Sequence, residues 1–145
     1  MSNKKDDLDI LNSIYKNCKM ASECIDGITE KCRSEELKDY IQKQRMHYDN
    51  SIEKVSKRIR ELGGEPVEPP RMDKMAAEMG INMKTAVDSS CSNIAKIMYN
   101  GTNMGIVDMS ETINRAKNAD EKTISQAKQL LSAEERYAQG LKGFL

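Results

Sequence analysis

Gln44 and His47 are the pair of side chains whose types and spacing most readily suggest chemistry. They lie three residues apart in the stretch KQRMHYDNS, residues 43–51, where a helix is expected to present apolar side chains to an interior. Residues three apart share one face of a helix, so the amide and the imidazole can approach a common point. The pair is consistent with two structures: half of a metal site, or a polar patch inside an ordinary helical bundle.

Cysteines offer a second candidate for metal or redox chemistry. The four are Cys18, Cys24, Cys32 and Cys91, and their spacing matches neither a CxxC motif nor a zinc knuckle. In a straight helix Cys18 and Cys24 lie about 9 Å apart along the axis, beyond the roughly 7 Å Cα separation that a disulfide allows. We therefore expect free, reduced thiols that pack as small hydrophobic side chains, as in a cytoplasmic protein.

Composition limits the classes of function. The 145 residues are enough for one core, and we expect a single helical-bundle domain over residues 1–145. The 23 Lys and Arg residues balance 23 Asp and Glu residues, so no nucleic-acid partner is expected. No segment approaches the run of about 18 apolar residues that a membrane span requires, and no apolar signal segment opens the chain. We expect a cytoplasmic protein with no membrane partner.

Apolar residues recur at helical spacing in the first half of the chain. One stripe covers residues 11–32, and Ser34, followed by two glutamates, is typical of the N-cap of a second helix. The stretch ELGGEP, residues 61–66, predicts the end of that helix. Gly63 or Gly64 can adopt the left-handed conformation there, and the prolines that follow stop a helix from resuming. These two helices are expected to form an antiparallel hairpin.

The second half of the chain is also predicted to be helical. A methionine-rich stripe over residues 72–86 predicts a short helix. Residues 88–93 favour caps and turns, so we expect a break there and a restart near Ser90. A second break is possible at residues 99–102, because Asn100 and Gly101 suit a C-cap and Thr102 an N-cap. Apolar residues keep helical phase through residues 99–105, however, which favours one helix across that stretch.

Two glycines in this third long helix, Gly101 and Gly105, are expected to permit close backbone approach. Residues 118–120 predict the next break. The last helix should then follow a heptad pattern on Ile124, Ala127, Leu131, Glu134, Ala138, Leu141 and Leu145.

These elements predict an all-α fold, because no segment shows the alternation of a strand. Four long helices in two hairpins favour a four-helix bundle, with an additional helix inserted in the crossover between the two hairpins. The basic stretch KVSKRIR, residues 54–60, lies where the second helix ends, and positive charge is expected at a helix C-terminus.

A helical hairpin ending in ELGGEP, followed by a proline-bearing linker and a shorter helix, resembles a ferritin-like family of small bacterial proteins of unknown function. The resemblance spans nearly the whole chain and implies a ferritin-like four-helix bundle. Active members of that superfamily hold two iron or manganese ions in the core. Their ligands are a Glu from each of two helices and a Glu-x-x-His motif from each of the other two.

Against that ligand set, this chain is incomplete. Gln44 stands where a carboxylate should precede His47, and Glu134 is followed by Tyr137 where a histidine should stand. The first helix offers a cysteine and the third offers glycines where further carboxylates are required. One inward carboxylate and one histidine cannot neutralise two divalent ions, so we expect no metal and no other cofactor.

The leading hypothesis is a non-catalytic ferritin-like bundle with a degenerate di-metal site that acts by packing or partner binding. It is expected to be a homo-oligomer through an apolar helix face. In this interpretation Gln44 and His47 form a hydrogen-bonded polar layer, with Glu23 or Cys24 across the hairpin as partner. An enzyme is not expected, because the single histidine lies in mid-helix and neither a nucleophile elbow nor a phosphate-binding loop occurs.

Two alternatives remain open. The chain could be a metal-binding or redox member of the same superfamily, using a reduced set of His47, Gln44, Glu134 and Cys24. It could also bind a small molecule near the polar layer, which requires a cavity that a sequence does not reveal.

Overall fold

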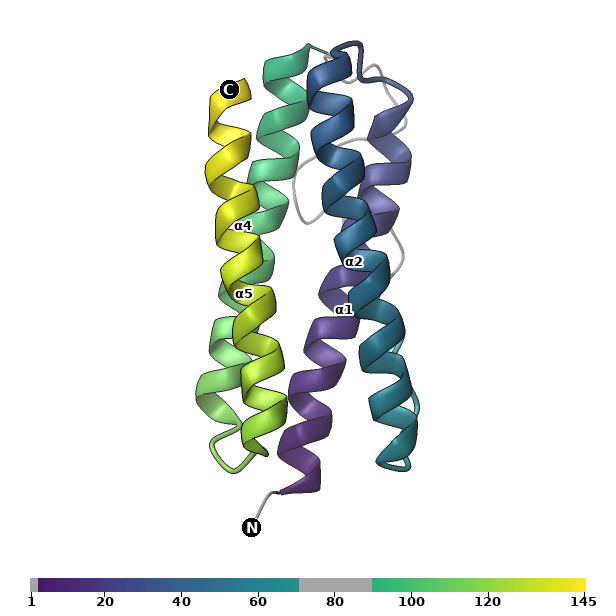
Figure 1. The fold of residues 1–145 in the computed structure, drawn as a ribbon, viewed down its shortest axis with the longest axis vertical. Helices are drawn as coiled ribbons and strands as arrows, with labels where there is room; N and C mark the ends of the chain where they lie inside the picture. The colour runs from purple at the N-terminus through teal and green to yellow at the C-terminus, as the bar shows by residue number, and fades with distance from the viewer. Residues whose placement is uncertain (1–2, 71–89) are drawn as a thin grey trace.

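The computed structural model describes residues 3–70 and 90–145. Within these residues the chain forms four α-helices and one short 3-10 helix, and no strand (Figure 1). The elements are α1 (Lys4–Thr29), α2 (Glu35–Glu61), α4 (Cys91–Arg115), α5 (Glu121–Leu141) and the 3-10 helix η1 (Lys142–Phe144). The predicted all-α bundle is confirmed, whereas the methionine-rich helix expected at residues 72–86 lies outside the described residues.

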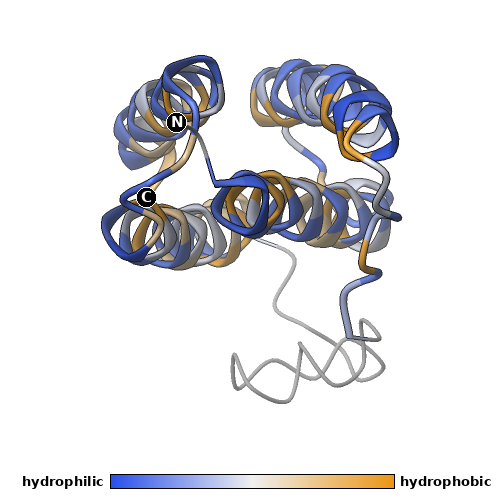
Figure 2. Ribbon diagram, turned by 90° about the horizontal axis from the view of Figure 1, so that it is seen from below, coloured by the Kyte–Doolittle hydropathy of each residue, from blue (hydrophilic) through white to orange (hydrophobic). Residues whose placement is uncertain are grey.

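The helices form two antiparallel hairpins that lie side by side (Figure 1). Helices α1 and α2 make one hairpin, α4 and α5 make the other, and α1 packs against both α4 and α5. Apolar residues face the interior of the bundle and polar residues face outward (Figure 2). This distribution is the one that hydrophobic burial requires of amphipathic helices. None of the described helices is long and apolar enough to cross a membrane.

Capping side chains fix where the helices begin. The Ser34 hydroxyl accepts from the Leu37 amide at 3.2 Å, which confirms the predicted start of α2. Ser90 caps α4 in the same way, so the predicted restart near Ser90 is also confirmed. Asp120 caps α5 at the predicted break. Each oxygen satisfies an amide that has no partner inside the helix.

Gly63 ends α2 with a φ of 82°, in the left-handed region that favours glycine. Its amide bonds to Arg60 O at 2.9 Å, and the Gly64 amide bonds to Ile59 O at 3.0 Å. These two bonds form a Schellman motif. The chain then passes along α1, where Val67 N donates to the Asn12 side chain at 2.9 Å.

Helix α4 runs without interruption through residues 99–105, as predicted. The expected close backbone approach at Gly105 is wrong. A Cβ there would meet side-chain atoms instead, at 3.7 Å from Asn17 Oδ1 and 3.9 Å from Glu134 Oε2. The missing side chain therefore leaves space beside Glu134.

The predicted heptad of the last helix fails at its end. Helix α5 stops at Leu141, and Leu145 is 54% exposed. The 3-10 helix turns the chain so that Phe144 packs against the core and against the Tyr40 ring, with 5.8 Å between centroids. Leu130 is buried where the heptad named Leu131, which is only half-buried.

All four cysteines lie in the described residues and are free, as predicted. Cys18 and Cys32 are buried among apolar side chains, while Cys24 and Cys91 are half-buried. They pack as small hydrophobic residues.

Candidate functional site

A layer of polar side chains crosses the middle of the bundle, with Gln44 at its centre. Gln44 is 0% exposed, and its Nε2 donates to Tyr48 Oη at 2.5 Å and to Thr102 Oγ1 at 3.1 Å. The Thr102 hydroxyl in turn donates to Met98 O at 2.8 Å. The layer therefore links α2 to α4 through hydrogen bonds that an apolar interior makes strong.

Glu134 extends this layer from α5. It is 4% exposed, and its Oε1 has no hydrogen-bond partner among the described residues. Burial raises the pKa of Glu134 to about 7, although a hydrogen bond with the Tyr48 hydroxyl acts in the opposite direction. Near neutral pH this carboxyl group therefore exchanges between its charged and protonated forms, and it keeps one free acceptor.

Cys18 of α1 completes the layer. Burial raises the pKa of its thiol well above the ordinary value, and the nearby Glu134 carboxylate raises it further, while a hydrogen bond with Ser51 lowers it. Cys18 is therefore a protonated thiol near neutral pH. Together these side chains bring all four helices to one level of the bundle.

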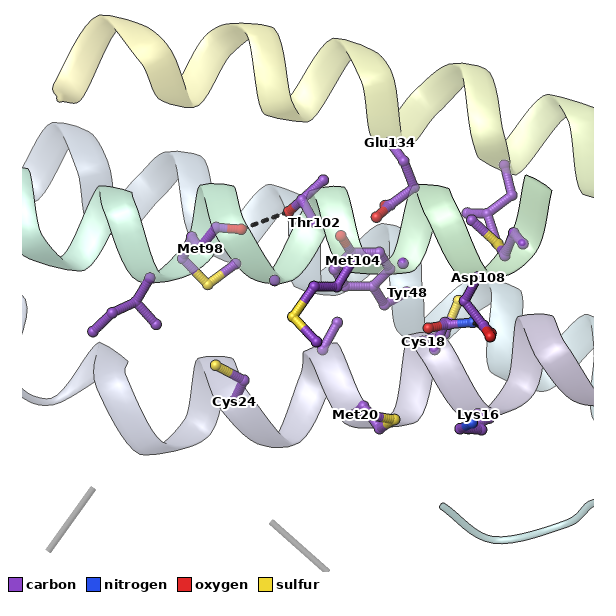
Figure 3. A pocket seen from close by; sticks show the side chains of 17 residues that line it. Lys16, Cys18, Met20, Cys24, Tyr48, Met98, Thr102, Met104, Asp108 and Glu134 are labelled. Atoms are coloured by element: carbon purple, nitrogen blue, oxygen red, sulfur yellow. Dashed lines mark hydrogen bonds between the residues drawn. The ribbon is translucent and has the colours of Figure 1, made fainter. Parts of the chain in front are cut away.

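A pocket of about 200 Å³ opens next to the layer, between α1 and α4. Glu134 points into it from α5, and Met98 and Met104 of α4 lie beside it (Figure 3). Its other sulfur-bearing side chains are Cys18, Met20, Cys24 and Met109. The pocket thus combines mostly apolar walls with one buried acid, the usual make-up of a small-molecule site.

Hydrogen-bonded polar side chains line part of the pocket. Asn17 Nδ2 donates to Asp108 Oδ2 at 2.7 Å, and the Ser13 hydroxyl donates to the same oxygen at 3.1 Å. Asn17 and Asp108 line the pocket, and Lys16 lies next to them. The α1–α4 pair is therefore held together by a polar contact next to apolar walls.

His47 lies apart from this pocket. It lines a groove between α2 and α5, where its ring is 5.7 Å from the Tyr137 ring between centroids. Burial lowers the pKa of His47, and the charges of Arg136 and Lys54 lower it further. The sequence pattern left the inward position after Gln44 to either Tyr48 or His47, and Tyr48 takes it, so His47 does not join Gln44 in the interior.

The predicted partner of Gln44 is also wrong. Neither Glu23 nor Cys24 bonds to it, and its partners are Tyr48 and Thr102. The hairpin register explains the error, because Arg45 pairs with Asp26 and the Ser22 hydroxyl bonds to Asp49. In this register Gln44 lies across from residue 27, four residues beyond Glu23. Its side chain points inward, toward Thr102 of α4.

Of the four candidate ligands, the structure brings three to the pocket region. Glu134 and Cys24 line the pocket, Gln44 reaches it through Tyr48, and His47 is in the other groove. Sequence reasoning missed Thr102, Asn17 and Asp108. Only Thr102 could have been found from the sequence, because it lies three residues before Gly105 and so shares its face of α4.

The core does not fit the two metal ions of active ferritin-like proteins. The polar layer, where those ions would lie, carries Cys18, Gln44, Thr102 and Glu134, which include one carboxylate and no histidine. Among the described residues no three His, Cys, Asp or Glu side chains cluster in a geometry that could hold a metal ion. Two divalent cations would remain largely uncompensated there.

The two antiparallel hairpins form a four-helix bundle of the ferritin-like fold, which two solved structures share. One is a dodecameric thioferritin, the bacterioferritin-related protein of Bacteroides fragilis; its TM-score is 0.76 at 18% identity, covering 99% of this chain and 86% of that one. The other, from Anabaena variabilis, has a DJ-1/ThiJ/PfpI-like domain and a ferritin-like domain; its TM-score is 0.75 at 20% identity. That match covers 98% of this chain and 36% of the Anabaena chain. At these identities the likeness establishes the fold alone.

The family follows from sequence. A family model described as a domain of unknown function, DUF2383, matches residues 6–115, and the chain belongs to that family. A search of curated proteins finds no significant match.

Proposed function

We propose that this chain is a non-catalytic ferritin-like bundle that binds a small organic molecule in the pocket beside Glu134. The observation that carries the proposal is the pocket of about 200 Å³ next to the buried polar layer. The sequence left small-molecule binding open on the condition that a cavity lies near the polar layer, and this pocket meets that condition. Its lining supplies the two kinds of contact, apolar walls and a fixed polar anchor, that small-molecule sites use.

The volume sets the size of the ligand. A cavity of about 150 Å³ is large enough for benzene, so about 200 Å³ admits roughly eight to ten non-hydrogen atoms. Methionine side chains such as Met98 and Met104 adapt their shape to different apolar groups. The apolar part of the ligand is therefore expected to be short and of loosely defined shape.

The polar anchor sets the chemistry of the ligand. Glu134 Oε1 is a buried acceptor without a partner, and Asp108 adds a second acid to the lining. A ligand that donates a hydrogen bond, as an alcohol or an amine does, would satisfy that oxygen. An amine should bind more tightly than an alcohol, because its positive charge favours the ionised form of Glu134.

The lack of catalysis is part of the proposal. Burial raises the pKa of Cys24 to about 11 and also raises the pKa of Cys18, which keeps both thiols protonated and weakly nucleophilic. The imidazole that would activate them belongs to His47, in the other groove. That separation also weakens the metal-binding alternative, since His47 does not join Glu134 and Cys24.

Ligand titrations followed by NMR of methionine methyl groups test the proposal. The probes are hexylamine, hexanol and hexanoate, which share one alkyl chain and differ in the polar group. Hexylamine and hexanol should shift the methyl signals of Met98 and Met104, and hexylamine should bind more tightly. Hexanoate should bind most weakly, because it places a second carboxylate beside Glu134.

Met46 provides an internal control for these titrations. It is 65% exposed on α2 and does not line the pocket, so its signal should stay in place. Equal affinity for hexanoate and hexylamine, or equal shifts at Met46 and Met98, would show that the probes do not bind at Glu134.

We also propose that the chain forms a homo-oligomer through an apolar helix face. Val107 and Met104 lie three residues apart on α4 and are 55% and 49% exposed. Apolar side chains gathered on one face are typical of surfaces that bind a partner. The dodecameric assembly of the thioferritin from Bacteroides fragilis supports self-association as the form of that contact.

A further inference from the structure

The groove between α2 and α5 carries an uneven charge. Its volume is about 680 Å³, and its lining includes five cationic side chains but only one carboxylate, that of Glu61. The cationic residues are Lys54, Lys57, Arg58, Lys122 and Arg136. Within residues 3–70 and 90–145, none of these five forms an ion pair with an acidic side chain.

Helix-end electrostatics explain only part of this cluster. Lys57 and Arg58 lie near the C-terminus of α2, where the helix dipole favours positive charge. Lys122, however, lies in the first turn of α5, where the dipole disfavours a cation. A protein whose acidic and basic residues balance overall therefore concentrates unpaired positive charge in one groove.

The shape and lining of the groove indicate what it can hold. Its apolar floor is nearly closed, since Val55 is 1% exposed and Leu130 is 5% exposed. The apolar surface that stays accessible therefore belongs mainly to the alkyl stems of the long polar side chains. The polar lining consists of the five cations, the Glu61 carboxylate, the His47 imidazole, and hydroxyl and amide groups of Ser51, Ser125, Gln126 and Gln129.

The groove is also long. Its lining extends along α2 from His47 to Glu61, about 21 Å at 1.5 Å per residue. Antiparallel α5 spreads Lys122 and Arg136 over a similar length. On α2 the three cations lie between Lys54 and Arg58, within about 6 Å, so the positive charge is dense there and extends along α5 as far as Arg136. Such a group of cations matches several linked negative charges better than a single anion.

We propose that this groove binds an oligophosphate, either free or carried by a nucleotide. Each phosphate presents oxygens that lysine, arginine and hydroxyl donors bind through charge-assisted hydrogen bonds. The groove volume lies in the range of small-ligand sites. The site is separate from the pocket beside Glu134, and Leu130 is the one residue that lines both among the described residues.

Calorimetric titration with inorganic tripolyphosphate at low salt tests this site. The variant Lys57→Gln/Lys122→Gln removes one cation from each side of the groove without touching its floor. The matched control is Lys43→Gln/Lys128→Gln, which neutralises two exposed lysines on the same two helices outside the groove. Both variants should retain the helical content and melting temperature of the wild type, because all four positions are exposed.

We expect the groove variant to raise the Kd for tripolyphosphate at least about tenfold, the effect of losing one charge-assisted hydrogen bond. The control variant should stay within about twofold of the wild type. Equal weakening by both variants, or no heat of binding at low salt, would overturn the proposal.

A second titration separates the two sources of phosphate. ATP should bind with an affinity like that of tripolyphosphate and lose it in the groove variant. A single-stranded DNA oligonucleotide should bind more weakly than either, because the groove lining contains no aromatic side chain other than that of His47. Tight DNA binding without tripolyphosphate binding would make the groove a nucleic-acid surface and contradict the oligophosphate site.

Discussion

Glu134 combines burial, a hydrogen bond and an unused acceptor in one side chain. Its pKa rises from the ordinary 4.5 to about 7 on folding, chiefly because burial disfavours the charged form. Between these two pH values the folded protein retains a proton that the unfolded chain releases. The contribution of this carboxyl group to the free energy of unfolding is therefore most favourable below about pH 4.5 and is lost as the pH rises through 7.

The variant Glu134→Gln should remove this pH dependence. At pH 8 it should unfold with a free energy on the order of 3 kcal/mol greater than the wild type, whereas at pH 4 the two should be nearly equal. Urea denaturation at both pH values measures the difference. The control Glu135→Gln changes an exposed neighbour and should behave as the wild type. A Glu134→Gln gain of the same size at both pH values would mean that the Glu134 pKa is not raised.

At the scale of elements, Gly105 of α4 and Gly140 of α5 differ in the room that each leaves for a side chain. A Cβ at Gly105 would make ordinary van der Waals contact with side-chain atoms of Asn17 and Glu134, the nearest at 3.7 Å. A Cβ at Gly140 would instead collide with the Tyr40 hydroxyl. That hydroxyl donates to Tyr137 O at 3.1 Å and fixes α2 against α5.

Alanine substitutions should therefore act in opposite directions at these two positions. Gly105→Ala should raise the free energy of unfolding by up to about 1 kcal/mol, because alanine is the better helix former and its methyl group fits. Gly140→Ala should lower it by about 1–3 kcal/mol, because Tyr40 must move and lose its hydrogen bond. Thermal and urea unfolding of the two variants measure both changes. A lower free energy of unfolding for Gly105→Ala would mean that no room for a methyl group exists beside Glu134.

At the scale of the molecule, the sequence determined most of the fold and little of the site. Ser34, Ser90 and Gly63 carry local signals, caps and a left-handed turn, that depend on few neighbours and so could be predicted. The placement of the His47 side chain in the groove could not be predicted, because it depends on how α2 packs against α5. Cavities such as the one beside Gly105 follow from the packing of several helices, which a periodic pattern does not specify.

The proposed assembly makes a prediction at this scale too. Light scattering should give a mass several times that of one chain. Val107→Lys, which places a charge on the exposed face of α4, should reduce that mass toward the monomer. Val67→Lys charges an equally exposed valine outside the helices and should leave the mass unchanged. A monomeric wild type would refute self-association and would leave the binding site proposed within one chain intact.

The most direct test of the central claim is the Kd of hexylamine for the wild type and for Gly105→Leu, measured by calorimetry. The leucine side chain occupies the pocket from α4, while Gly143→Leu adds the same group where a Cβ would meet nothing within 4 Å. Binding to the wild type and to Gly143→Leu, with loss of binding in Gly105→Leu, is the predicted result. Equal Kd values for all three proteins would contradict a ligand site beside Glu134.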